Sequence, residues 1–211
     1  HLVATTTNAT YTSVVDSAVV ERAGSSRALI KICGSMSDGS RRWLPFTLRL
    51  YAYAANEQLR MVHSFIYDGD QDKDFISSLG MTFDVPLRKE AYNRHVMFAM
   101  DGDKMWHEPV QPLEGRSPLD RNYNWQERQQ AGFEIPAANT FDERQQTFLS
   151  EWASWDGFRL SQLNDGSFTI RKNAQHDRPW IGTFTGCRSY GLAFVGDTGG
   201  GLALSLKDFC Q

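Results

Sequence analysis

Apolar and polar residues alternate along most of the chain, and this period of two predicts β-strands. The clearest case is WLPFTLRLYAYA, residues 43–54, which a short link separates from QLRMVHSFIYD, residues 58–68. These two segments predict a hairpin. Further strands are expected at residues 11–20, 27–33, 80–87, 94–100, 158–163, 167–172, 180–186, 190–196 and 201–209.

One segment has the period of a helix instead. Thr140 and Glu143 have capping-box spacing, and Gly157 is expected to end the helix. An apolar stripe at three-to-four spacing follows the cap and is expected to pack on a sheet. The stripe comprises Phe148, Leu149, Trp152 and Trp155.

Many short strands with one short amphipathic helix predict an all-β fold, an antiparallel β-sandwich or barrel. We expect one β-rich domain over residues 1–211, with a long surface excursion over Glu114 to Ala138, where periodicity is lost. Both ends of the sequence interrupt the pattern abruptly. The chain is therefore expected to be part of a longer, multidomain polypeptide.

Composition narrows the possible functions. Of 211 residues, 41% are hydrophobic and 22% charged, which predicts a packed core, and the net charge of −3 without a basic stripe argues against a nucleic-acid partner. No apolar run is long enough for a membrane helix.

Cys33, Cys187 and Cys210 allow at most one disulfide, with the pairing open. No nucleotide, metal or other cofactor motif is present, so neither a metal nor a cofactor is expected.

Four aspartates occupy alternate positions in the segment Asp68 to Asp74. A calcium loop of the EF-hand type would need glycine at its sixth position and glutamate at its twelfth, but these positions hold Lys73 and Leu79. The segment therefore predicts an acidic turn after a strand rather than a metal site.

The densest group of reactive side chains is Tyr92, Asn93, Arg94 and His95. On a strand, Tyr92 and Arg94 would share one face and the other two the opposite face, whereas at a bend all four could converge. The alternative is a strand edge whose polar groups meet solvent.

A second group, Trp106, His107 and Glu108, would suit a sugar subsite or a loop anchored by a buried tryptophan. Residues 176–180, HDRPW, predict a loop.

Several blocks of the sequence, in order, resemble the exo-rhamnogalacturonan lyase and YetA-like family of polysaccharide lyases. They are RRWLPFTLRLYAYA, HSFIYDGDQDKDFISSLGMTFDVPL, YNRHVMFA, WHEPVQPL and GLAFVGDTGGGLALSLKDF. The resemblance implies the amino-terminal region of much longer proteins, described as a RIFT-related barrel or sandwich. It also implies an acidic plant polysaccharide and the remaining domains of the same polypeptide as partners, and an extracellular location.

The resemblance suggests a fragment of a lyase that cleaves rhamnogalacturonan-like pectin by β-elimination. Such chemistry needs a cation or amide on the C5 carboxylate, a base for the C5 proton and an acid for the leaving oxygen. By chemical suitability, Tyr92, Arg94 and His95 are the catalytic candidates. Asn93 would assist at the carboxylate, with Trp106, His107 and Glu108 binding substrate.

Two alternatives stay open. The first is a non-catalytic β module that binds carbohydrate or packs against a catalytic domain, and it leaves open whether this chain is active by itself. The second is a glycoside hydrolase, which would need two opposed carboxylates, for which Asp68 and Glu108 are the candidates.

Overall fold

The computed structural model of the protein describes residues 1–113 and 124–209. The chain divides into two units, His1–Asp84 and Val85–Gln211. The sequence predicted one domain over residues 1–211. The first unit contains only strands: β1 (Leu2–Thr6), β2 (Thr10–Ala23), β3 (Arg27–Ser37), β4 (Arg42–Tyr53), β5 (Leu59–Phe65) and β6 (Ile76–Met81).

The first unit is one antiparallel sheet of order β5-β4-β3-β2-β1-β6. The predicted hairpin is confirmed as β4 and β5, in which Phe46 faces Phe65 across the strands. The expected strand over 80–87 is wrong beyond Met81, because β6 pairs with β1 only as far as Leu2. The core of the unit comprises Leu2, Ala4, Tyr11, Met36, Trp43, Leu44 and Phe46.

The aspartate-rich segment is a turn, as predicted. Asp68 Oδ1 accepts a hydrogen bond from the backbone of Leu44 at 2.7 Å. Both carboxylate oxygens of Asp74 accept from the Arg41 guanidinium at 2.7 Å, and this contact lowers the pKa of Asp74 to about 2. Among the described residues, no group of three or more His, Cys, Asp or Glu side chains is placed to hold a metal ion.

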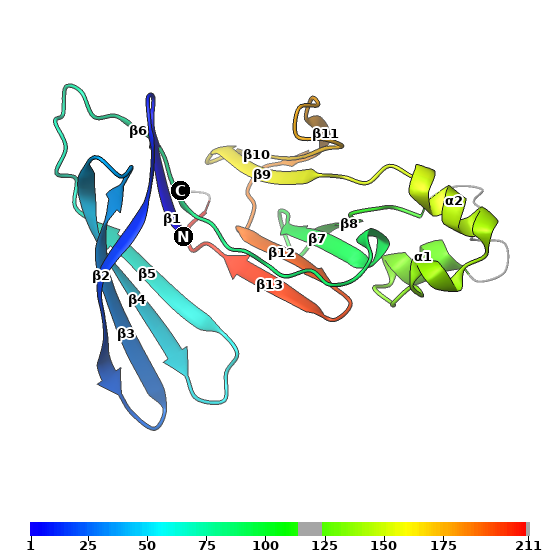
Figure 1. Ribbon diagram of the computed structural model, residues 1–211, viewed down its shortest axis with the longest axis horizontal. Coiled ribbons are helices and arrows are strands. Elements are labelled where there is room, and N and C mark those ends of the chain that lie inside the picture. Colours follow the sequence, from blue (N-terminus) through cyan, green and yellow to red (C-terminus); the bar gives the residue numbers. More distant parts are fainter. Residues whose placement is uncertain (114–123, 210–211) are drawn as a thin grey trace. The chain divides into compact units, whose positions relative to one another are not determined.

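The second unit is a β-sandwich with short helices at one end (Figure 1). One sheet has the order β13-β12-β7-β8 and the other the order β11-β10-β9. The strands are β7 (Arg94–Ala99), β8 (Met105–Pro109), β9 (Gly157–Asn164), β10 (Ser167–Asn173), β11 (Ile181–Gly186), β12 (Leu192–Asp197) and β13 (Gly200–Ser205). The two sheets share a core of Val96, Phe98, Met100, Phe168 and Ile170.

The helical elements are η1 (Ala91–Asn93), α1 (Trp125–Gln130), η2 (Ala138–Thr140) and α2 (Glu143–Glu151). The predicted helix is α2, but its capping box joins Asp142 to Gln145, and it ends at Glu151 rather than at Gly157. Helix α1 was not predicted and lies within the expected excursion. Residues 114–123 of that excursion lie outside the described residues.

Two further observations bear on the sequence expectations. Cys33 and Cys187 are free thiols, and Cys210 lies outside the described residues. In the part of the chain that the structure describes, no helix is both long enough and apolar enough to cross a membrane.

Candidate functional site

Tyr92 and Asn93 face the helical end of the second unit, where both are almost fully buried. The Tyr92 hydroxyl donates to the carbonyl of Pro136 at 2.8 Å, and burial raises the pKa of Tyr92 to about 12. The Asn93 amide donates to the carbonyl of Ile135 and accepts from its N–H, both at 2.8 Å. These two side chains therefore hold residues 135–136 in place.

His95 points away from this cluster and pairs with His107 instead. His95 Nδ1 lies 2.8 Å from His107 Nε2, and the two rings stack with their centroids 4.9 Å apart. His95 is only 5% exposed, and its Nε2 is buried without a hydrogen-bond partner. Burial, reinforced by the neighbouring His107, lowers the pKa of His95 to about 4, and burial lowers the pKa of His107 as well.

Trp106 and Glu108 lie on the opposite face of β8 from His107. The Trp106 ring stacks on Phe98 in the sandwich core, with centroids 5.7 Å apart. Glu108 forms an ion pair with Lys172, whose ammonium group lies 3.8 Å from the centroid of the Trp155 ring. The ion pair joins β8 of one sheet to β10 of the other.

The predicted site residues therefore do not converge in one open site. Tyr92 and Asn93, the histidine pair, and the Trp106–Glu108 group occupy three separate places. Asp68, the partner proposed for Glu108 in a hydrolase, is bound to the backbone of Leu44 in the first unit. Tyr92 lines an open pocket of about 590 Å³ together with Glu90 and Gln111. Arg94 lies beside a second pocket, because its Nε donates to the carbonyl of Lys89, which lines that pocket, at 2.7 Å.

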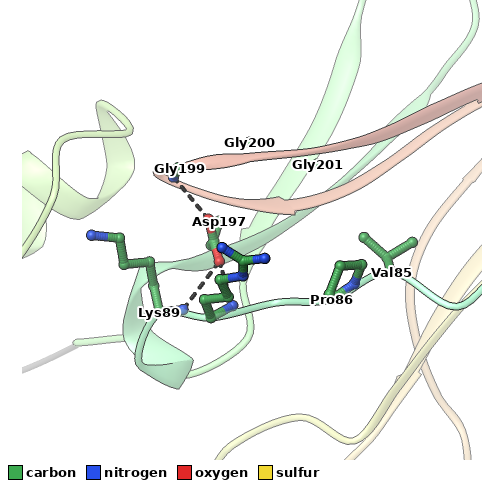
Figure 2. Close-up of a pocket in the computed structure, with 8 residues that line it drawn as sticks. Val85, Pro86, Lys89, Asp197, Gly199, Gly200 and Gly201 are labelled. Carbon is green, nitrogen blue, oxygen red and sulfur yellow. Dashed lines mark hydrogen bonds between the residues drawn. The ribbon is translucent and has the colours of Figure 1, made fainter.

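That pocket is a groove of about 410 Å³ between the segment Val85–Lys89 and the tip of the β12–β13 hairpin (Figure 2). We call it the hairpin groove. Asp197 fixes both of its sides, accepting hydrogen bonds from the backbone N–H groups of Arg88 at 2.8 Å and Lys89 at 3.1 Å through one oxygen. The other oxygen accepts from Gly199 at 2.8 Å. These backbone donors lower the pKa of Asp197, led by that of Arg88.

Glycines line the hairpin side of the groove. Gly200 has a φ of +140°, which side chains disfavour. A Cβ on Gly201 would lie 2.5 Å from the Cα of Gly196 and 2.5 Å from the carbonyl oxygen of Val195. A side chain is therefore disfavoured at both positions of this tip.

Two cations lie at the groove. Lys89 forms an ion pair with Glu134 at 2.7 Å, which raises the pKa of Lys89, and Figure 2 shows its side chain directed away from Asp197. Arg88 is exposed and forms no ion pair among the described residues. A guanidinium that lacks a protein partner is suited to bind a carboxylate by two parallel hydrogen bonds.

The sequence analysis missed both the hairpin groove and a buried amide, that of Gln129. The sequence analysis placed Val85 and Pro86 in an expected strand over residues 80–87 and gave the glycines 199–201 no functional role. Only the cations of Arg88 and Lys89 could have signalled the groove. Gln129 on α1 is 1% exposed and donates to the carbonyls of Tyr92 and Gln111 at 2.7 and 2.9 Å, while accepting from Leu113. A glutamine in a polar segment gives no sequence signal of such burial.

Two stacked antiparallel sheets around one apolar core define the second unit as a β-sandwich. Residues 2–211 match the family model described as PcRGLX-like protein central beta sandwich domain, and the chain belongs to this family. The match spans both units. Its description gives a central domain, whereas the sequence analysis expected the amino-terminal region of the family's proteins.

A relative from Bacillus subtilis (strain 168), the protein YetA, is 32% identical to the chain over 204 residues. The aligned region covers 94% of this chain and 23% of YetA. The chain therefore spans about a quarter of the length of this curated relative.

Proposed function

We propose that this chain is the β-sandwich part of a larger extracellular polysaccharide lyase acting on rhamnogalacturonan-like pectin. Its role is to bind acidic polysaccharide in the hairpin groove, and proton transfer belongs to other parts of the protein. The observation that carries this proposal is the exposed, unpaired Arg88 in an open groove, set against the burial of both predicted proton-transfer residues.

The burial of Tyr92 and His95 argues against catalytic roles for them. A general base works best with a pKa near the operating pH, and a His95 pKa of about 4 leaves its imidazole a weak base. The pKa of Tyr92, about 12, leaves the phenol a weak acid, and its hydroxyl is already bound to the Pro136 carbonyl. Tyr92 does line a pocket of about 590 Å³, so the case against its catalytic role depends on this weakly acidic, already bound hydroxyl.

The hairpin groove fits the expected ligand better. Uronic acids carry one carboxylate per residue, and Arg88 offers a planar, permanently charged group to it. The glycine tip leaves backbone groups accessible to sugar hydroxyls, and Pro86 and Val85 supply an apolar wall. Because Asp197 ties both sides together, the groove is formed before ligand binds.

Binding of tetragalacturonate to the chain, measured by isothermal titration calorimetry, tests the groove. Arg88→Ala should weaken binding about tenfold, because a hydrogen bond to a charged group contributes about 1.5 kcal/mol or more. Arg144→Ala, at an exposed arginine on α2, is the matched control and should bind as wild type does. If the Arg88→Ala and Arg144→Ala variants bound tetragalacturonate with equal affinity, the hairpin groove would not be its binding site.

The absence of a catalytic role is tested in the intact protein. The β-elimination proposed for the intact protein forms an unsaturated sugar that absorbs in the ultraviolet. Lyase turnover is therefore measured directly from this absorbance. Folded His95→Gln protein should keep turnover within a few-fold of wild type. A loss of about 10²- to 10⁴-fold, the range for removal of a general base, would instead restore the catalytic assignment of His95.

A further inference from the structure

One face of the sheet in the first unit is apolar over four neighbouring strands, β2, β3, β4 and β5 (Figure 1). Residues that pair in register across these strands project from the same side of the sheet. Four rows on one side contain no charged residue, and His63 is their one polar side chain. We call these rows the apolar face. They are Val15, Gly34, Phe46 and Phe65; Ala18, Ile32, Leu48 and His63; Val20, Ile30, Leu50 and Met61; and Ala23, Ala28, Ala52 and Leu59.

The opposite face of the same strands is more polar. Lys31 and Arg49 lie in one row with Val19, and Arg49 forms an ion pair with Glu21 at 3.3 Å. The neighbouring row is Ser17, Cys33, Thr47 and Ser64. Because a sheet with one polar and one apolar face is stable only when a second layer covers the apolar side, this pattern predicts a partner for the apolar face.

The core of the first unit covers one end of the apolar face. Phe46 belongs to this core and Leu48 packs against it. A groove of about 200 Å³ continues from there, with Leu48 and Met61 in its lining. Beyond the groove the face is open, since Val20 is 64% and Leu59 50% exposed. Four strands about 4.8 Å apart and four rows about 6.7 Å apart give an area on the order of 500 Å², and an apolar patch of this size marks an interaction site.

The composition of the apolar face indicates what kind of partner covers it. A polysaccharide needs hydrogen-bonding groups beside the apolar contacts, and only His63 offers them here. Transient protein interfaces are about as polar as the rest of a protein surface, whereas permanent ones resemble a domain core cut in half. The apolar face is of the permanent kind, so its partner is an apolar protein surface that is always present.

The same polypeptide can supply such a partner. The aligned region covers 23% of YetA, so about three quarters of that relative lie outside it. A segment linked covalently to the face meets it at an effective concentration of about millimolar. A second copy of the chain does not reach this concentration in ordinary solutions, so the linked segment has the advantage.

We propose that the apolar face is a docking surface for an apolar, uncharged surface of the same polypeptide outside residues 1–211. The groove beside Met61 then receives an apolar side chain of this partner. The inference rests on the proposed function in one respect, that the chain is part of a larger protein. It goes beyond that function because it gives the first unit a role, whereas the hairpin groove lies in the second unit.

Cysteine labelling of the chain and of the intact protein tests this assignment. Val20 and Val19 are neighbours on β2 that project from opposite faces and are 64% and 52% exposed, so Val20→Cys and Val19→Cys form a matched pair. Reaction with N-ethylmaleimide is followed by peptide mass spectrometry, which separates these thiols from the native ones. In the chain alone, both should react at similar rates. In the intact protein, Val20→Cys should react at least about 100-fold more slowly, because a covered thiol reacts only after local opening, and Val19→Cys should change less than about threefold.

A second pair on the edge strand β5 makes the test independent of one position. Leu59 belongs to the apolar face, and Arg60 projects from the other side, where its guanidinium lies 5.6 Å from the centroid of the Tyr51 ring. Leu59→Cys should be protected in the intact protein, and Arg60→Cys should not. The melting temperature of each variant shows that it is folded before its labelling is compared.

Four results would overturn the inference. Equal labelling of Val20→Cys in the chain and in the intact protein would leave the apolar face uncovered. Protection in the chain alone at low concentration would mean that no further segment is needed, and protection that grows from micromolar to hundreds of micromolar chain would assign the face to a second copy. Equal protection of Val19→Cys and Val20→Cys in the intact protein would mean that both faces are enclosed.

The labelling result and the hairpin groove fail separately. None of the four labelled positions lines the groove, so tetragalacturonate binding and its weakening by Arg88→Ala are measured independently of the labelling. If tetragalacturonate did not bind while Val20→Cys was protected in the intact protein, the binding role would fail and the docking surface would stand.

Discussion

Acidification should destabilise the second unit through His95. The pKa of His95 is about 4 in the folded chain, against about 6.5 for an unperturbed histidine, so the unfolded chain binds a proton more readily. The stability from the neutral, buried imidazole is fully present above about pH 6.5 and is lost as pH falls towards 4. For a single group with these two values, the loss between pH 7.5 and pH 5 is about 2 kcal/mol.

The loss is measured as the change in melting temperature between pH 7.5 and pH 5, and about 2 kcal/mol corresponds to about 4 to 8 °C for a chain of this size. His95→Gln removes the titrating group, so its melting temperature should fall much less over this range, whatever its absolute value. His176→Gln, at an exposed loop position, is the control and should behave as wild type does. If wild type and His95→Gln lost equal stability on acidification, His95 would not be the group responsible, and the burial argument against its catalytic role would fail with it.

Three other perturbations have definite expected results. Gln129→Leu leaves two buried carbonyls and one buried N–H without partners, so the free energy of unfolding in urea should fall by at least about 2 kcal/mol. An unchanged free energy of unfolding would contradict the three hydrogen bonds of the Gln129 amide. Gly201→Ala should lower the melting temperature and abolish tetragalacturonate binding, because its Cβ meets backbone, whereas Gly182→Ala has open space and should do neither. Calcium at millimolar concentration should shift the melting temperature by less than about 1 °C, since residues 68–74 form a turn, and a rise of several degrees would refute this.

Local patterns in the sequence predicted the elements that depend on local interactions. The hairpin of β4 and β5 follows from alternation on two neighbouring segments with a short link, and both strands formed. Helix α2 follows from its apolar stripe, although the cap is Asp142 rather than Thr140. Thr140 belongs to η2, where its hydroxyl donates to the carbonyl of Ala137 instead.

The missed elements depend on partners far away in the sequence. β1 is only five residues long and is fixed by pairing with β6, about seventy residues later, as well as with β2. Helix α1 has no side-chain cap, because Asn124 precedes it in the left-handed conformation. Its position depends on Gln129, whose partners lie in other segments, so no periodicity could have revealed it.

The separation of the four candidate residues 92–95 also depends on contacts that are distant in the sequence. The sequence places four reactive groups at residues 92–95, but only the structure shows that η1 ends at Asn93 and β7 begins at Arg94. This change of conformation separates Tyr92 and Asn93 from His95. The pairing of His95 with His107 depends on the register of β7 against β8, in which Met97 faces His107. β8 was not predicted as a strand from the sequence.

The position of a residue within the sheet explains why the hairpin groove is better placed for a polymer than the reactive cluster. β7 is an interior strand between β12 and β8, and four of its six residues are buried, so polar side chains on it lose water and must find protein partners. A hairpin tip lies at the end of a sheet, where backbone groups and neighbouring cations stay in solvent. Asp197 is the last residue of β12, and its carboxylate holds the hairpin tip against the backbone of Arg88 and Lys89. These hydrogen bonds fix the tip although its residues are not buried in the core. The burial of β7 therefore favours a packing role for its reactive residues, and the exposed Arg88 beside the hairpin tip supports the proposed binding role.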